Sequence, residues 1–293
     1  MPEVTEINVL PSGSACGAEV RGVDISRPLS EPTFAQVRGA FFEHGMLVFR
    51  DQSISERQQI DFTARFGEPD QYVLSEYQAQ GYPEILLISN LQREGKNIGL
   101  ADAGTTWHTD SSYLPTPPLA TLLYAREVPM QNGRVLGDTI FTSAAAAYDA
   151  LTDATKATIE GLTATHWYHG KHQARAKLGR SDRNAPKPSE AEKLAPVDHP
   201  IVRTHPVTGR KALYVAQGEC IGIAGWDEDK ALALIDELAE HTVSTAFHYR
   251  HRWQAGDLVI WDNCQLQHLA IKDYALPLRR LMHRTQVKGT APF

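Results

Sequence analysis

A histidine and a carboxylate two residues apart are the side chains of this sequence best suited to chemistry. They are His108 and Asp110, within the stretch W-H-T-D-S-S-Y that spans residues 107–113. Residues i and i+2 of a β-strand point to the same face, so we expect the two side chains to converge on one point. One further histidine would complete the two-histidine, one-carboxylate set that holds iron(II). The pattern alone is weak, because a chain with 12 histidines contains an H-x-D by chance about once.

A candidate for the third ligand lies far downstream. His268 follows an apolar strand predicted at 258–261 and precedes a last strand predicted at 281–287. Two adjacent arginines, Arg279 and Arg280, stand just before that last strand, and Arg284 lies within it. The side chains that must meet are therefore about 160 residues apart, so their placement depends on the elements between them.

Short strands dominate these elements. Apolar runs and alternation predict strands at 46–49, 82–90, 119–127, 137–141, 201–205, 212–215, 258–261 and 281–287. Helical spacing predicts helices at 32–44, ended by Gly45, at 53–67, at 144–150, at 153–160, and from Asp227 onward. Ser53 and Glu56 match a capping box at the start of the second helix. The order favours a mainly β fold, a barrel or jelly roll with helical insertions.

Domain organisation follows from length and from one polar segment. All-β chains of 293 residues often form one unit, so we expect a single domain over residues 1–293. Residues 169–199 are rich in Lys, Arg, Ser, Asp and Pro and contain few large apolar residues. A polar stretch of this length inside a domain is typical of a mobile functional loop, so we expect a lid there.

Composition and charge exclude several classes of function. The chain is 42% hydrophobic and 22% charged, as ordinary globular proteins are. A net charge of −6 without a run of lysine and arginine argues against a nucleic-acid partner. No signal segment is evident, and no stretch approaches the roughly 20 apolar residues of a membrane span. Three distant cysteines offer no disulfide framework, so we expect a protein of the reducing cytoplasm.

Several ordered motifs together resemble one family. W-H-T-D at 107–110, W-D-N-x-x-x-x-H ending at His268, and R-R-L-M-H-R at 279–284 are similar to the taurine dioxygenase and 2,4-D dioxygenase (TauD/TfdA) family. R-F-G at 65–67, G-D-T at 137–139 and T-H-P-V-T-G-R at 204–210 extend the resemblance over nearly the whole chain. Members are iron(II)/2-oxoglutarate-dependent dioxygenases with a double-stranded β-helix core. The resemblance also implies a homo-oligomer, either a dimer or a tetramer.

The resemblance assigns the metal ligands. It places Fe(2+) on His108, Asp110 and His268. Two imidazoles and one carboxylate leave three positions for 2-oxoglutarate and O2, whereas an all-carboxylate site would favour harder ions. The presence of Asp110 implies hydroxylation rather than halogenation, because halogenating relatives lack this carboxylate.

The resemblance also implies residues that hold the cosubstrate. It places the C5 carboxylate of 2-oxoglutarate on an arginine helped by a threonine, which matches Thr139. Arg279 and Arg280 face opposite sides of a strand, and alignment from Leu281 selects Arg280, with Arg279 as a solvated surface charge. Arg284, on the same face as Arg280, matches an arginine near both the cosubstrate and the anionic head of the substrate.

Other aromatic and histidine side chains are weaker candidates. His166 and Tyr168 match positions where the family places substrate contacts, and Tyr72 is a candidate wall of the pocket. The spacing of His166, His169 and His172 could indicate a second metal site, but ligands at i, i+3 and i+6 would spread around a helix. We expect His248 and His251, beside Arg250 and Arg252, to lie on a solvated strand face.

The substrate is expected to differ from taurine. The positions after R-F-G and before W-H-T-D read E-P-D-Q-Y-V-L-S and A-G-T-T, so the residues that hold taurine in the family are missing. We therefore expect a small anionic substrate such as a sulfonate, an aryloxyalkanoate or a related acid. Two alternatives remain open: a cupin-like metal-dependent hydrolase or isomerase, and a non-catalytic small-molecule binding barrel.

Overall fold

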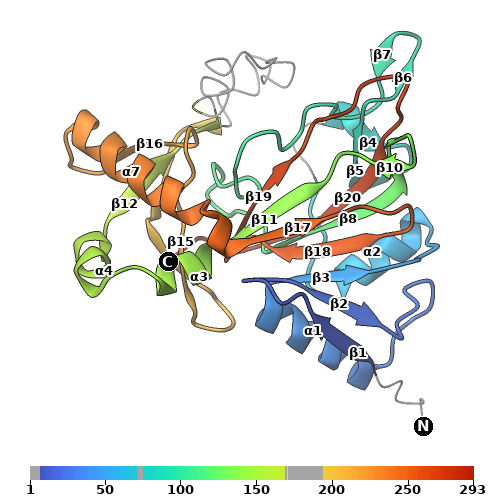
Figure 1. Ribbon diagram of the computed structural model, residues 1–293, viewed down its shortest axis with the longest axis horizontal. Coiled ribbons are helices and arrows are strands. Elements are labelled where there is room, and N and C mark those ends of the chain that lie inside the picture. Colours follow the sequence, from blue (N-terminus) through green and yellow to red (C-terminus); the bar gives the residue numbers. More distant parts are fainter. Residues whose placement is uncertain (1–6, 72–74, 169, 171–193) are drawn as a thin grey trace.

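An eight-stranded sheet forms the centre of the fold (Figure 1). The computed structural model describes residues 7–71, 75–168, 170 and 194–293. The sheet has the order β1 (Asn8–Pro11), β2 (Ala18–Arg21), β3 (Met46–Phe49), β18 (Leu258–Asp262), β8 (Ala120–Glu127), β20 (Leu281–Val287), β5 (Tyr82–Ser89) and β4 (Gln78–Ala79). Strands β3 and β18 are buried along their whole length, which explains their continuous apolar sequences.

Two helices cover one face of this sheet (Figure 1). Helix α1 (Glu31–His44) begins at the N-cap Ser30 and ends at Gly45, whose φ of 70° is readily adopted only by glycine. Helix α2 (Glu56–Ala64) begins at Ser55, and the side chains of Ser55 and Gln58 form its capping box. The predicted capping box at Ser53 and Glu56 was therefore wrong by two residues, because two overlapping serine patterns compete in this stretch.

A three-stranded sheet covers the opposite face. It has the order β17 (His248–His251), β11 (Thr139–Ser143) and β19 (Leu266–Ala270). Alternate residues of β3 point to opposite faces of the central sheet. Leu47 and Phe49 pack with the helices, whereas Met46 and Val48 pack toward the three-stranded sheet. The mainly β class with flanking helices is thereby confirmed.

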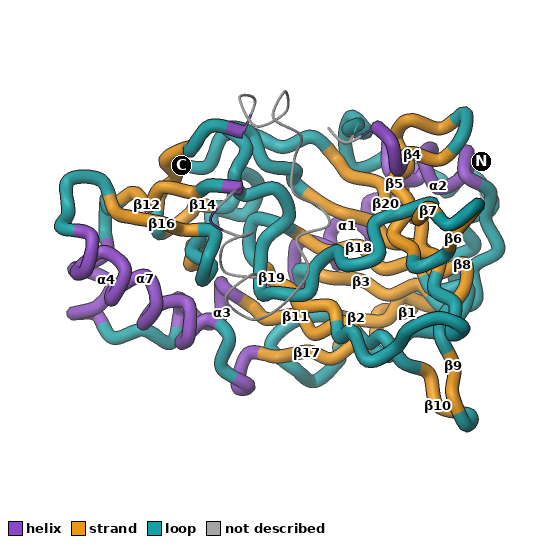
Figure 2. Tube along the Cα trace, turned by 90° about the horizontal axis from the view of Figure 1, so that it is seen from above, coloured by secondary structure: helices purple, strands orange, loops and turns teal. Residues whose placement is uncertain are grey.

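A further group of elements stands at one end of the molecule. Figure 2 shows α3 (Ala144–Asp149), α4 (Asp153–Ile159) and α7 (Glu228–Thr242) at the end opposite the strand pair β9 (Met130–Gln131) and β10 (Arg134–Val135). The same group contains a sheet of β13 (Val197–Pro200), β12 (Thr163–His166) and β16 (Cys220–Ile223), and the predicted hairpin of β14 (Val202–Thr204) with β15 (Lys211–Leu213). The remaining short elements are β6 (Gln92–Arg93), β7 (Lys96–Asn97), and the 3-10 helices η1 (Ser75–Tyr77) and η3 (Thr245–Phe247).

Two expectations need qualification at this level. His251 does not lie on a solvated face: it is fully buried, and its Nε2 lies 3.1 Å from Oδ2 of Asp257. Neighbouring residues of a strand point to opposite faces, so Arg250 is exposed and His251 points inward. Most of the predicted lid at 169–199 lies outside the described residues, and its last residues belong to β13.

No helix in the described part of the chain is long and apolar enough to cross a membrane.

Replacing Phe41 with alanine should lower the free energy of unfolding by about 3–5 kcal/mol, because this fully buried ring of α1 packs on the central sheet. Chemical denaturation measures the loss. Phe293→Ala is the control, since that ring is 63% exposed, and it should change stability by less than about 0.5 kcal/mol. Equal effects of the two substitutions would contradict this view of the core.

Candidate active site

A single β-bridge brings the two candidate histidines together. The amide of His268 donates to the carbonyl of His108 over 2.9 Å, and the amide of His108 donates back over 3.2 Å. The two imidazole centroids are 4.1 Å apart as a result. Residues 108–110 are not the strand that we expected: the bridge ends at His108, and a turn that includes Ser111 at φ 53° carries Asp110 back toward the rings.

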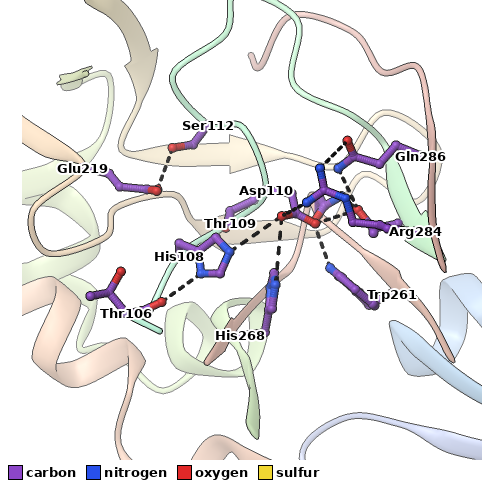
Figure 3. Close-up of polar contacts among 12 residues, drawn as sticks. Thr106, His108, Thr109, Asp110, Ser112, Glu219, Trp261, His268, Arg284 and Gln286 are labelled. Atoms are coloured by element: carbon purple, nitrogen blue, oxygen red, sulfur yellow. Dashed lines mark hydrogen bonds and ion pairs between the residues drawn. The ribbon is translucent and has the colours of Figure 1, made fainter. Parts of the chain in front are cut away.

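The three candidate ligands converge in a buried site (Figure 3). Oδ1 of Asp110 lies 3.6 Å from Nε2 of His108 and 4.0 Å from Nε2 of His268. One ligand atom from each residue falls within 4.8 Å of the others, and all three residues are at most 6% exposed. This spacing leaves room for one ion between them.

The protonation of His108 suits metal binding. Its Nδ1 lies 2.8 Å from the carbonyl oxygen of Thr106, and a carbonyl can only accept, so Nδ1 carries the proton. The lone pair of Nε2 is then directed toward Asp110. Gly104 permits this placement, because a Cβ there would lie 3.3 Å from Cε1 of His108.

Asp110 is held as a carboxylate. Burial by itself would raise its pKa, but the nearby charge of Arg284 is the largest opposing effect, and the pKa lies well below its usual range. Nη1 of Arg284 lies 3.4 Å from Oδ1 of Asp110. Two imidazole nitrogens and one anionic oxygen fit a divalent ion such as iron(II).

A buried guanidinium contacts the segment that leads into β11, the strand paired with β19, which carries His268. Arg280 is 4% exposed, and its Nη1 donates to the carbonyl of Gly137 over 2.5 Å. Its charge faces the rings of Trp253 and Tyr274, with centroids at 5.8 and 5.6 Å. Burial lowers its pKa, yet a guanidinium stays protonated in proteins, so this site is suited to a bound anion.

Thr139 shares the environment of Arg280 through Trp253. The indole Nε1 of Trp253 donates to Oγ1 of Thr139 over 3.0 Å. An indole N–H can only donate, so the hydroxyl proton of Thr139 is directed to another acceptor. Arg279, in contrast, is exposed and pairs with Glu127 over 2.8 Å. The structure therefore separates the two arginines: Arg279 lies at the surface and Arg280 is buried.

Comparison with known proteins agrees with this geometry. Residues 8–286 match the model of the taurine catabolism dioxygenase TauD, TfdA family. The chain belongs to the TauD/TfdA family. It is 33% identical to the alpha-ketoglutarate-dependent 2,4-dichlorophenoxyacetate dioxygenase of Cupriavidus pinatubonensis, over 91% of this chain and 92% of that protein. It is 30% identical to the (S)-phenoxypropionate/alpha-ketoglutarate-dioxygenase of Delftia acidovorans, with coverage of 98% and 99%.

Solved structures support the family at the level of fold. A crystal structure of AAD-2 in complex with Mn(II) and N-oxalylglycine superposes with a TM-score of 0.80 at 33% identity, covering 98% of this chain and 99% of that one. A taurine dioxygenase from Burkholderia xenovorans gives a TM-score of 0.81 at 31% identity, covering 98% and 90%. The TauD/TfdA chain described here is accordingly an oxidoreductase of the 2-oxoglutarate-dependent dioxygenase class.

A second group of possible ligands has a structural explanation. His205, Asp262 and Cys264 also lie within 4.8 Å of one another. Nδ1 of His205 accepts from the amides of Val207 and Thr208 at 3.0 Å each, so Nε2 carries the proton that it donates to Asp262 over 2.7 Å. Burial raises the pKa of the Cys264 thiol well above its usual range. These bonds tie the T-H-P-V-T-G-R loop to the W-D-N turn.

The weaker candidates separate in the structure. His166 is 1% exposed, with Nδ1 3.1 Å from Oγ of Ser112 and Nε2 3.5 Å from Sγ of Cys220, and burial lowers its pKa to about 3. Tyr168 packs edge-on against Tyr113 with centroids 4.7 Å apart. Tyr72, His169 and His172 lie outside the described residues. Contact of Tyr72, His166 or Tyr168 with substrate stays a prediction.

Sequence reasoning missed the residues that support the ligands. Thr121 bonds the far oxygen of Asp110, and Asn263 and Gln286 bond the hydroxyl of Thr121. Trp253 and Tyr274 flank Arg280. Asn263 is part of the W-D-N motif. The others stand at ordinary strand and loop positions, and no local pattern distinguishes them.

Gly137→Ala should destabilise the protein more than Gly133→Ala does. Both glycines have φ near 75°, so both pay about 1–2 kcal/mol for a left-handed alanine. A Cβ at 133 meets nothing, whereas one at 137 would collide with Arg280 and lie 2.9 Å from Tyr274, which adds about 1–3 kcal/mol of overpacking. Thermal and urea unfolding measure the difference. Equal losses in the free energy of unfolding would show that the space around Gly137 and Arg280 accommodates a methyl group.

Proposed function

We propose that this enzyme hydroxylates an sp3 carbon of a small anionic substrate, with 2-oxoglutarate decarboxylated to succinate and CO2. The observation that carries the proposal is the convergence of His108, Asp110 and His268; the buried Arg280, which contacts the segment before the neighbouring strand β11, supports it. When bound, iron(II) together with 2-oxoglutarate and O2 supplies the oxidising equivalents for cleaving a C–H bond. His108, Asp110 and His268 would hold the iron, and the protein contributes orientation and the exclusion of water.

Arg280 and Thr139 are the proposed contacts for the C5 carboxylate of 2-oxoglutarate. Arg280 already gives one N–H to Gly137, and its remaining donors are available to an anion. Trp253 orients the Thr139 hydroxyl so that its proton is free for the same carboxylate. The burial of Arg280, Thr139 and Trp253 strengthens each charged hydrogen bond, because little water competes.

Arg284 is the proposed contact for the anionic group of the substrate. Its side chain is 11% exposed and lies at the ligand carboxylate, so an anion held there would place its neighbouring carbon near the metal. Two relatives are named for 2,4-dichlorophenoxyacetate and (S)-phenoxypropionate, and another for sulfate esters. We therefore propose aryloxyalkanoates, sulfate esters or sulfonates as the substrate class. Tyr72, His166 and Tyr168 are the proposed walls of the pocket.

The finer architecture is part of the same proposal. We propose that the eight-stranded and three-stranded sheets form a jelly-roll core within one catalytic domain. The bridge between His108 and His268 would then lie at the mouth of the roll, where small-molecule sites are common in β-barrels.

Purified enzyme with iron(II), 2-oxoglutarate and O2 should release succinate when the correct substrate is present. A screen over aryloxyalkanoates, sulfate esters, sulfonates and amino acids identifies that substrate, and the hydroxylated product should match succinate one to one. Asp110→Ala should abolish substrate-coupled succinate release, because it removes the anionic ligand. Turnover that persists with zinc and without O2 would instead support the hydrolase or isomerase alternative.

Arg280→Ala should raise the KM for 2-oxoglutarate by about 10- to 150-fold, since each lost charged hydrogen bond is worth about 1.5–3 kcal/mol. Steady-state kinetics at varied 2-oxoglutarate measures the change. Arg279→Ala is the matched control, because this neighbouring arginine is exposed and pairs only with Glu127 among the described contacts, and its KM should stay within about twofold of wild type. An equal rise in both variants would refute the choice of Arg280.

A further inference from the structure

The carboxylate of Asp110 has a second, buried partner on its far side. Oγ1 of Thr121, on β8, donates to Oδ2 of Asp110 over 2.7 Å. The same hydroxyl oxygen accepts from Nδ2 of Asn263 over 3.0 Å and from Nε2 of Gln286 over 3.1 Å. Figure 3 shows Asp110 beside Arg284, with Gln286 and Trp261 near the same carboxylate. Thr121 and Asn263 are completely buried.

The orientation of both amides follows from partners that can only donate. Nε1 of Trp261 donates to Oδ1 of Asn263 over 3.1 Å, which turns the NH2 of that amide toward Thr121. Nη2 of Arg284 lies 3.4 Å from Oε1 of Gln286, which turns the NH2 of Gln286 toward the same hydroxyl. Indole and guanidinium groups have no acceptor, so neither amide can be reversed without losing a hydrogen bond.

The hydrogen-bond inventory of Thr121 then leaves one choice. A hydroxyl has one proton and two lone pairs. The N–H groups of Asn263 and Gln286 occupy both lone pairs, so the proton goes to Oδ2 of Asp110. The opposite oxygen, Oδ1, is the one that lies 3.6 and 4.0 Å from the imidazole nitrogens.

We propose that Thr121 is a positioning residue that makes Asp110 a one-oxygen metal ligand. This inference rests on the proposed function, because it assumes a metal at the three ligands. Thr121 holds Oδ2 away from the ion and leaves Oδ1 to bind it. Thr121 touches neither metal nor substrate, and it acts only through the carboxylate.

The denticity of Asp110 decides how many positions the ion keeps for chemistry. An octahedral ion held by two imidazoles and one oxygen would retain three positions, enough for a bidentate 2-oxo acid and O2. A second oxygen from Asp110 would take one of them. The Thr121 hydroxyl therefore protects the position on which the reaction depends, and this gives the buried hydroxyl a role that packing alone does not require.

Thr121→Val and Thr121→Ser separate the hydroxyl from the shape of the side chain. Valine replaces the hydroxyl with a methyl group of similar size, whereas serine keeps the hydroxyl. Titration of the metal-free full-length protein with Co(II), followed by its visible absorption, reports affinity and coordination without any turnover. Valine should weaken Co(II) binding by about 10- to 100-fold and change the spectrum, and serine should stay within about threefold of wild type.

A second measurement needs no variant. A crystal structure of the wild-type protein loaded with Mn(II) should show one oxygen of Asp110 bonded to the ion and the other bonded to Thr121. Two Asp110 oxygens bonded to Mn(II) would overturn the inference, even where Thr121→Val fails to fold. Wild-type affinity and spectrum in a folded Thr121→Val protein would also overturn it. A wild-type protein that binds no Co(II) at His108, Asp110 and His268 would overturn the proposed function as well.

Discussion

The backbone bridge between His108 and His268 is the constraint on which the rest of the site depends. It joins a loop to the edge of the three-stranded sheet, and two amide hydrogen bonds of 2.9 and 3.2 Å set the separation of the imidazoles. Side-chain rotamers then need only small adjustments to meet one ion. Ala270 donates to Gly104 at the same edge of β19, and Ile271 donates to Asp138 on its other side, where the bond extends the pairing with β11. Backbone hydrogen bonds therefore join β19, which carries His268, to the G-D-T segment, whose Gly137 accepts from Arg280.

Buried charge is the second organising feature of the site. Asp110, Arg280 and Arg284 carry formal charges in an environment where unpaired ions are costly. Arg284 offsets Asp110, while aromatic rings and one carbonyl only partly satisfy Arg280. A bound cation would give the Asp110 carboxylate a further opposite charge. A bound carboxylate would accept the remaining hydrogen bonds of the Arg280 guanidinium. The charges of the protein are in this sense complementary to the metal and cosubstrate that the family uses.

The sequence predicted the elements well because each has a local cause. The fully apolar run of β3, the Gly45 stop of α1 and the alternation of β20 all depend on neighbouring residues. In β20, Met282 packs toward the small sheet, while Thr285 bonds Thr63 of α2 over 2.7 Å. The strand assignment at Asp110 failed because the convergence comes from a turn and a long-range bridge. No pattern near Thr121 or Trp253 could reveal contacts with residues more than 100 positions away.

The supporting contacts differ in kind between the candidate metal ligand Asp110 and the proposed substrate residue Tyr168. Around Asp110, donor-only groups fix the two amides, the amides fix Thr121, and Thr121 fixes the carboxylate. Each of these hydrogen bonds has one chemically allowed orientation, so we expect a substitution at any residue of this hydrogen-bond series to disturb the Asp110 carboxylate. Tyr168, in contrast, meets Tyr113 through ring packing, which tolerates changes of size more readily than a hydrogen-bond network does. The relatives are named as alpha-ketoglutarate-dependent dioxygenases of substrates as different as phenoxy acids and sulfate esters, which is consistent with variation at the proposed substrate residues of a shared fold.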